Sequence, residues 1–159
     1  MMRISLCAAH ATLAGLGLLG GAALPAFAAL GDNVASVSSD LVHMKAQMKG
    51  VTPHAGFTVQ EIATPSGTLV REYISPTGTV FAVSWNGPTK PDLRQLFGSY
   101  FQPFVDASSA APHNAATRRH FQVRAPDLVV QSNGHMRAFH GRAWVPSLLP
   151  PGVTPGDIE

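Results

Sequence analysis

Two histidines, two arginines and an aspartate lie within one short stretch near the C-terminus, "DLVVQSNGHMRAFHGRAWVP". Asn-Gly at residues 133–134 favours a type I′ turn, which predicts a β-hairpin. A two-residue turn at this point places Asp127 opposite His140, with Arg142 two residues further on the same face. A carboxylate that orients an imidazole is half of a general-base arrangement. Asp127, His140 and Arg142 are therefore the candidate catalytic residues.

The same hairpin carries two candidate metal ligands, His135 and His140. Metal ligands must converge on one point about 2 Å from each donor atom. Residues five apart in a regular strand point to opposite faces, so only a bulge near Gly141 would bring the two imidazoles together. We therefore expect no metal and no cofactor. A nucleophile near His140 is missing as well, because the chain has no GxSxG elbow, and we favour Asp127 as a simple cross-strand partner of that histidine.

The first 28 residues have the pattern of a secretory signal peptide. A basic start precedes the apolar run "LAGLGLLGGAAL", and "AFA" at residues 26–28 is a small-x-small cleavage site. The apolar run is about a dozen residues, short of the roughly 20 needed to span a bilayer, so we expect cleavage after Ala28. Residues 29–159 then form one small domain, periplasmic or secreted, without a transmembrane segment.

The composition of this expected mature domain limits its chemistry further. Cys7 is the only cysteine and lies in the leader, so the domain has no disulfide, no thiol nucleophile and no cysteine ligand. Loss of Arg3 with the leader lowers the formal net charge of +2 by one, which gives no basis for nucleic-acid binding. Motifs for phosphate, dinucleotide, zinc-protease or calcium-loop chemistry are also missing from the sequence.

The elements that must position the candidate residues begin with a helix over residues 32–49. Its apolar residues follow a spacing of three and four, the period of one helical face, with Asp32 to begin the helix and Gly50 to end it. A stripe of this kind is typical of a core helix, although it also suits a helix that docks a partner. The stripe consists of Val34, Val37, Leu41, Met44 and Met48.

A three-stranded meander is predicted over residues 56–85 by two similar turns, "TPSGT" and "SPTGT". Their geometry places Glu61 opposite Arg71 in the first hairpin. In the second hairpin it places Tyr73 opposite Phe81. The face that we expect to form the core consists of Phe57, Val59, Leu69, Tyr73, Phe81, Val83 and Trp85.

After the meander, Thr89 and Asp92 have capping-box spacing and begin a predicted helix that should stop or kink before Pro103. Residues 106–119 lack periodicity and are expected to form a mobile surface loop, followed by a short basic loop, "RRHFQVR". Residues 147–159 read as a proline-rich tail whose last residues fray. The helix predicted to begin at Thr89 and Asp92 has an apolar stripe that consists of Leu93, Leu96, Phe97, Tyr100 and Phe101.

Three segments of the chain are similar to one known family when they are taken together and in this order. They are "TPSGTLVREYISPTGTVFAVSWNGP", "PDLRQLFGSYF" and "DLVVQSNGHMRAFHGRAWVP". The chain resembles, over residues 30–158, the exported bacterial proteins known as domain of unknown function 2844. The resemblance implies a signal peptide and an envelope location. It implies no activity and no catalytic residues.

The sequence thus predicts an α+β fold. A mostly antiparallel sheet of about five strands, the three-stranded meander plus the hairpin, packs on one helix, with a second helix at the N-terminus. We expect an exported soluble envelope protein that serves as a non-enzymatic binding or accessory module. Its partner is unknown, with another envelope protein as one candidate. The alternative is a small hydrolase-like enzyme that uses Asp127 and His140.

Overall fold

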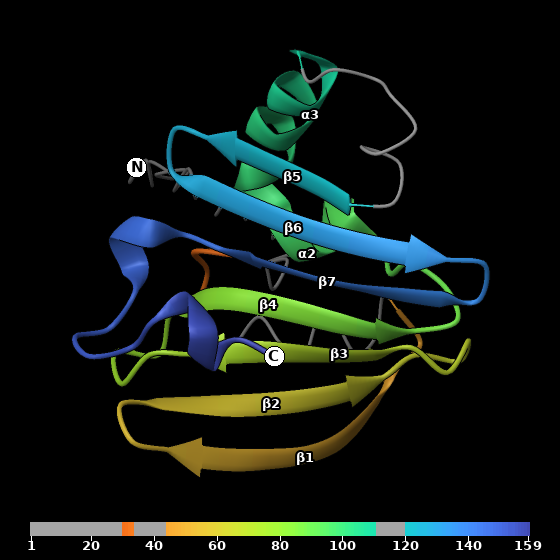
Figure 1. Cartoon of the computed structure of the whole chain (residues 1–159). Helices are drawn as coiled ribbons and strands as arrows, with labels where there is room; N and C mark the ends of the chain where they lie inside the picture. The colour runs from red at the N-terminus through yellow and green to blue at the C-terminus, as the bar shows by residue number, and fades with distance from the viewer. Residues whose placement is uncertain (1–29, 34–43, 111–119) are drawn as a thin grey trace, which may run out of the picture.

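One antiparallel sheet of seven strands organises the chain, in the order β1-β2-β3-β4-β7-β6-β5 (Figure 1). The computed structural model describes residues 30–33, 44–110 and 120–159. The strands are β1 (Gln47–His54), β2 (Phe57–Ala63), β3 (Leu69–Ile74), β4 (Val80–Gly87), β5 (His120–Ala125), β6 (Leu128–His135) and β7 (Ala138–Trp144). The predicted α+β class is confirmed, with seven strands in the sheet where the sequence predicts about five.

The meander β2–β3–β4 forms as predicted, and its first turn has the expected geometry. The Thr64 amide donates to the Thr68 carbonyl at 2.9 Å, and the second turn makes the equivalent bond. The first turn also sets the predicted register, with Glu61 directly opposite Arg71. Local turn chemistry is therefore sufficient to align β2 with β3.

The predicted register of β3 against β4 is wrong by one residue. The register shifts between Tyr73 and Ile74, so Tyr73 lies opposite Ala82 and not opposite Phe81. Phe81 is the additional residue of a β-bulge, which a turn-based alignment does not reveal. The predicted core face consequently mixes residues from both sides of the sheet. Val59, Tyr73 and Phe81 belong to one core cluster, and Val83 and Trp85 belong to the other.

The helical segment begins at Asp92, whose Oδ1 accepts from two amides of the first turn at 2.9 and 3.3 Å. It consists of α2 (Leu93–Phe97), the 3₁₀ turn η2 (Gly98–Tyr100) and α3 (Phe101–Ala110). Asp92, and not Thr89, is thus the N-cap of the helix. Pro103 does not end the helical segment, because Pro103 lies in the first turn of α3. A backbone N–H at that position has no helical acceptor, so its absence in proline costs no hydrogen bond. Residues 106–110, predicted as loop, are helical, and residues 111–119 lie outside the described residues. None of the helices in the described ranges is long and apolar enough to cross a membrane.

The β6–β7 hairpin forms, but its turn lies three residues beyond the predicted Asn-Gly. The two turn residues are Met136 and Arg137, and Arg137 has a positive φ of 63°. His140 therefore lies opposite Asn133, and the predicted pairing of His140 with Asp127 is wrong.

Two pairs of glycine and aromatic residues explain why β7 takes this register. Gly141 lies opposite Trp85 of β4, and a Cβ on Gly141 would approach Cζ2 of that indole to 2.3 Å. Gly134 lies opposite Phe139, and a Cβ there would approach the ring to 2.6 Å. Each ring thus occupies the space that a side chain on the opposing strand would fill. These cross-strand packing contacts outweigh the local preference of Asn-Gly for a turn.

The two edge strands are absent from the sequence prediction. Residues 47–49, expected at the end of the N-terminal helix, are part of β1, and Gly50 lies at a bulge within this strand. Residues 34–43, the middle of that predicted helix, lie outside the described residues. At the opposite edge, residues 120–124 belong to β5 and do not form the predicted basic loop.

The sheet has a core on each face. Helices α2 and α3 cover one face, here called the helix face, while the C-terminal segment crosses the other in front of β3 and β4 (Figure 1). We call residues 154–159 the strap and the sheet surface below them the strap face. The predicted fraying of the tail is wrong, because Ile158 is fully buried. The strap-face core consists of Val59, Tyr73, Phe81, Ala82, Val129, Trp144 and Ile158.

Candidate functional site

Two rows of polar side chains cross the strap face, and each strand that a row crosses contributes one residue to it. Residues directly opposite one another in an antiparallel sheet point to the same face, and neighbouring strands lie about 4.8 Å apart, so the members of a row are in contact range. The first row, from β2 to β6, is Glu61, Arg71, Ser84, Arg142 and Gln131. The second row, from β4 to β6, is Asn86, His140 and Asn133.

Arg142 of the first row anchors the strap. Its Nη1 donates to the carbonyl oxygens of Pro155 at 2.7 Å and Ile158 at 2.9 Å. Its Nε donates to Oε1 of Gln131 at 2.9 Å, which orients the guanidinium. Since β7 is a central strand of the sheet, Arg142 holds the strap to a rigid part of the fold.

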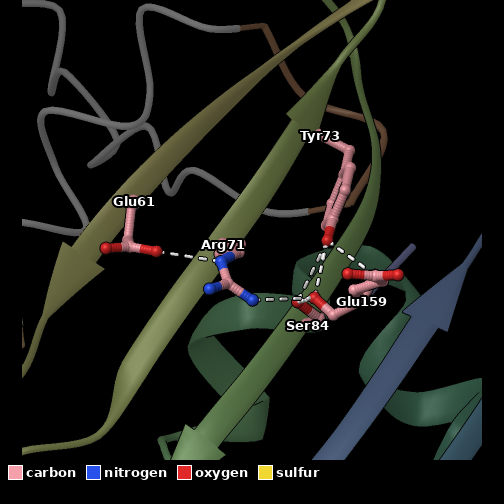
Figure 2. A network of polar contacts seen from close by, with 5 residues as sticks. All are labelled: Glu61, Arg71, Tyr73, Ser84 and Glu159. Atoms are coloured by element: carbon pink, nitrogen blue, oxygen red, sulfur yellow. Dashed lines mark hydrogen bonds and ion pairs between the residues drawn. The ribbon is translucent and has the colours of Figure 1, made fainter. Parts of the chain in front are cut away.

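A second set of contacts holds the last residue of the strap (Figure 2). The hydroxyl of Tyr73 donates to the backbone oxygen of Glu159 at 2.7 Å, and the amide of Glu159 donates back to that hydroxyl at 2.9 Å. The Ser84 hydroxyl also donates to this backbone oxygen. Arg71 donates to it at 3.3 Å and forms an ion pair with Glu61 at 2.9 Å, as the predicted register requires.

The strap begins with a capping box of its own. Oδ2 of Asp157 accepts from the amide of Thr154 at 2.7 Å and from its hydroxyl at 2.8 Å. These bonds stabilise the charged carboxylate, so they lower the pKa of Asp157 below the usual 3.8, with the backbone bond as the larger cause. The strap is thus a short, hydrogen-bonded structure attached to the sheet at both ends.

Two cavities lie on the strap face, one on each side of the strap. The β1 cavity, of about 540 Å³, lies over β1, β2 and β3. The β7 cavity, of about 460 Å³, lies over β4, β7 and β6. Arg71, Gly156 and Glu159 line both. The sheet residues of the β7 cavity include Arg71, Asn86, Gln131, Asn133, His140 and Arg142. Those of the β1 cavity include Lys49, His54, Phe57, Glu61, Arg71 and Tyr73.

The structure brings together two of the three predicted catalytic residues and separates the third. His140 and Arg142 both line the β7 cavity. Asp127 lies in the turn between β5 and β6, where its carboxylate accepts from the amide of Ser147 at 3.2 Å and from its hydroxyl. Along β6, Asp127 and Asn133, the partner of His140, are six residues or about 20 Å apart. The carboxylate is therefore out of hydrogen-bonding range of the imidazole.

The two candidate metal ligands share a face, contrary to the expectation that they point to opposite sides. His135 ends β6 opposite Ala138, and His140 lies opposite Asn133, the next residue of β6 on the same face. Only His140 lines the β7 cavity. Within the described residues, no group of three or more potential ligands among His, Cys, Asp and Glu comes together.

Sequence reasoning missed the amides of the site, Asn86, Gln131 and Asn133, and the two hydroxyls that hold the strap, Tyr73 and Ser84. The available signal is in β4, where Ser84 and Asn86 lie on either side of the buried Trp85. This alternation places Ser84 and Asn86 on one face of the strand, whereas the consecutive polar residues of β6 give no such signal. The alternation does not show that β4 lies beside β7, and this neighbour relationship is what joins the residues into rows.

These features define a small α+β domain, in which helices cover one face of a single antiparallel sheet and the chain's own C-terminal strap covers part of the other. The family model described as protein of unknown function (DUF2844) matches residues 26–158. The chain therefore belongs to this family, and the resemblance in the sequence is confirmed. No curated protein and no solved structure matches it.

Proposed function

We propose that this protein is an exported, non-enzymatic binding module of the cell envelope, and that its ligand contacts the strap face. The observation that carries the proposal is the pair of cavities beside the anchored strap. Most of their lining residues come from β-strands, which hold side chains in place more rigidly than loops do. The walls contain hydrogen-bonding groups together with aromatic rings, such as Phe57 and Tyr73 in the β1 cavity and Trp85 in the β7 cavity, as is common in sites for polar ligands.

The surroundings of His140 favour binding over acid–base catalysis. A histidine that acts as a general base is commonly oriented by a carboxylate, and Asp127, the predicted partner, is bonded to Ser147 instead. The one ion pair found within the described residues joins Arg71 to Glu61. His140 is exposed at the rim of the β7 cavity, a position that suits a contact to a ligand.

The proposal can be tested by NMR titration of the ¹⁵N-labelled protein. The ligands are soluble peptidoglycan fragments, neutral and acidic oligosaccharides, and short peptides. We expect at least one class to shift the amide signals of β3, β4, β7 and the strap, because these elements form the cavity walls. Shifts confined to α2 and α3 would contradict the proposal. If the protein hydrolysed an added ligand and the His140→Ala variant did not, the enzymatic alternative would replace the binding proposal.

Export is a separate part of the proposal with its own test. The N-terminal pattern supports removal of residues 1–28 during translocation. Mass spectrometry of the protein recovered from the periplasm or the medium should give Ala29 as the first residue. Recovery of the full-length chain from the cytoplasm alone would contradict export and leave the binding proposal in place.

A further inference from the structure

Arg142 carries a charge that no carboxylate in the described part of the chain offsets. Its three bonded N–H groups reach only neutral acceptors, the Gln131 amide and the carbonyls of Pro155 and Ile158. A guanidinium stays protonated at any physiological pH and has five N–H donors. The two on Nη2 therefore have no partner among the described residues. The one ion pair in this part of the chain is that of Arg71 with Glu61.

The other groups around the β7 cavity are mostly neutral hydrogen-bonding side chains. Asn86 and His140 form its wall next to Arg142 and are exposed. Of the described residues that line this cavity, Glu159 alone has a carboxylate, and its side chain is exposed. Glu61 and Asp157 line the β1 cavity. Among the described residues, the Arg142 guanidinium of the β7 cavity thus has no carboxylate partner; it lies 5.6 Å from the centroid of the Trp144 ring and beside several amide donors and acceptors.

We propose that the β7 cavity is a binding site for a hydroxylated anion, a carboxylate or phosphate group on a sugar-sized skeleton. This inference rests on the proposed function and names the ligand class of the same face. The Nη2 donors of Arg142 bind the anionic group, because charge-assisted bonds from guanidinium to such oxygens are strong. The amide of Asn86 bonds the hydroxyl groups. A volume of about 460 Å³ is large enough for one sugar unit.

Arg142 also anchors the strap, so its replacement would change the fold and the site together. Asn86 offers a cleaner test, because it is exposed and has no hydrogen bond to the strap. Asn86→Glu and Asn86→Gln introduce side chains of equal size that differ in charge. Asn86→Glu places a carboxylate in the cavity, where it repels an anion and competes for Arg142. Arg94→Gln, on α2 at the helix face, is the control for loss of one positive charge elsewhere.

The experiment is an NMR titration of the full protein and these variants with D-glucuronate, D-glucose 6-phosphate and D-glucose. We expect both anions to shift the Nε–H signal of Arg142 and the amides of Gln131 and His140. Glucose should bind at least about tenfold more weakly, as expected for the loss of one partly buried charge contact. Asn86→Glu should weaken anion binding at least about tenfold more than Asn86→Gln, since both displace the Asn86 amide and only the first adds a negative charge, while Arg94→Gln stays within about threefold of the unchanged protein. The relative affinities of the two anions identify carboxylate or phosphate as the natural group.

Four results would overturn the inference. If glucose binds this cavity as tightly as the anions, the site recognises neutral sugars and only the proposed function stands. If the Asn86→Glu and Asn86→Gln variants bind the anions with equal affinity, the anions do not bind through the charge of Arg142. If none of the three probes shifts the amide signals of the strap face, while other ligands of the wider panel do, the inference of an anion site fails and the proposed function stands. Shifts restricted to α2 and α3 with every ligand would remove both proposals.

Discussion

Arg142 on β7 donates from Nη1 to the carbonyl oxygen of Ile158 at 2.9 Å, and this bond joins a central strand to the strap. Ile158 is fully buried and belongs to the strap-face core. The strap therefore has both an apolar and a polar attachment to the sheet. Its anchored position divides the strap face into two cavities, so the residues that hold the strap also determine the shape of the candidate site.

Loss of the Arg142 anchor should destabilise the protein. We expect Arg142→Met to lower the free energy of unfolding by about 2–3 kcal/mol, because hydrogen bonds to charged groups contribute about 1.5–3 kcal/mol each and this side chain is only partly buried. Urea denaturation measures the change. Arg124→Met, at an exposed position of β5, is the matched control and should change stability by less than about 0.5 kcal/mol. Equal effects of the two substitutions would show that the strap bonds contribute nothing.

The hydroxyl of Tyr73 should contribute more to stability than that of the other tyrosine. Tyr73 is 2 % exposed and its hydroxyl bonds both backbone groups of Glu159. Tyr73→Phe should cost about 1–2 kcal/mol, since it removes the acceptor of the Glu159 amide and one of the donors to the Glu159 backbone oxygen. It should also speed hydrogen exchange of the Glu159 amide. Tyr100→Phe is the control, because Tyr100 is only partly buried, and an equal loss of stability in both variants would contradict the role assigned to Tyr73.

The register of β7 depends on Gly141, so Gly141→Ala should be severely destabilising. The new Cβ would lie 2.3 Å from Cζ2 of Trp85 and 2.7 Å from the backbone oxygen of Gln131. Neither the buried indole nor the central strand can move away easily, and we expect a loss of about 2–4 kcal/mol. Gly50→Ala is the control, because a Cβ at that position would have no atom within 4 Å. Thermal unfolding of both variants measures the difference, and a stable Gly141→Ala would show that this contact does not define the register.

The strap should respond to acid through Asp157. Its pKa is lowered in the folded protein by the bonds from Thr154, so the carboxylate stabilises the strap above its unfolded pKa. This contribution is lost as the pH falls below 3.8 and through the lower, folded value. An NMR titration of the Asp157 carboxyl carbon should give a midpoint below 3.8. Thr154→Ala, which removes the hydroxyl donor only, should raise that midpoint, and an unchanged midpoint would contradict the capping box.

In the β6–β7 hairpin, the face of several side chains could be predicted from the sequence even where their cross-strand partners could not. Val129, His140, Arg142 and Trp144 are predicted to share one face of the hairpin, and the structure places them there. A two-residue turn keeps the same alternation whether it lies at residues 133–134 or at 136–137. The move of three residues therefore changed which side chains are opposite one another, but not which face these four residues occupy, whereas His135, which now lies in β6 before the turn, changed face. This is why His140 and Arg142 stay together and Asp127 does not join them.

The sequence by itself determined what depends on near neighbours. The turn from Thr64 to Thr68 aligns Glu61 with Arg71, and local turn and strand patterns predict five of the seven strands, β2, β3, β4, β6 and β7. The tertiary structure alone decided that β7 lies between β4 and β6 and that the strap crosses the sheet. The pairing of β4 with β7 joins segments far apart in the chain and depends on the packing of Trp85 over Gly141. Such packing is a property of the folded molecule, because both partners come into contact only when the sheet is complete.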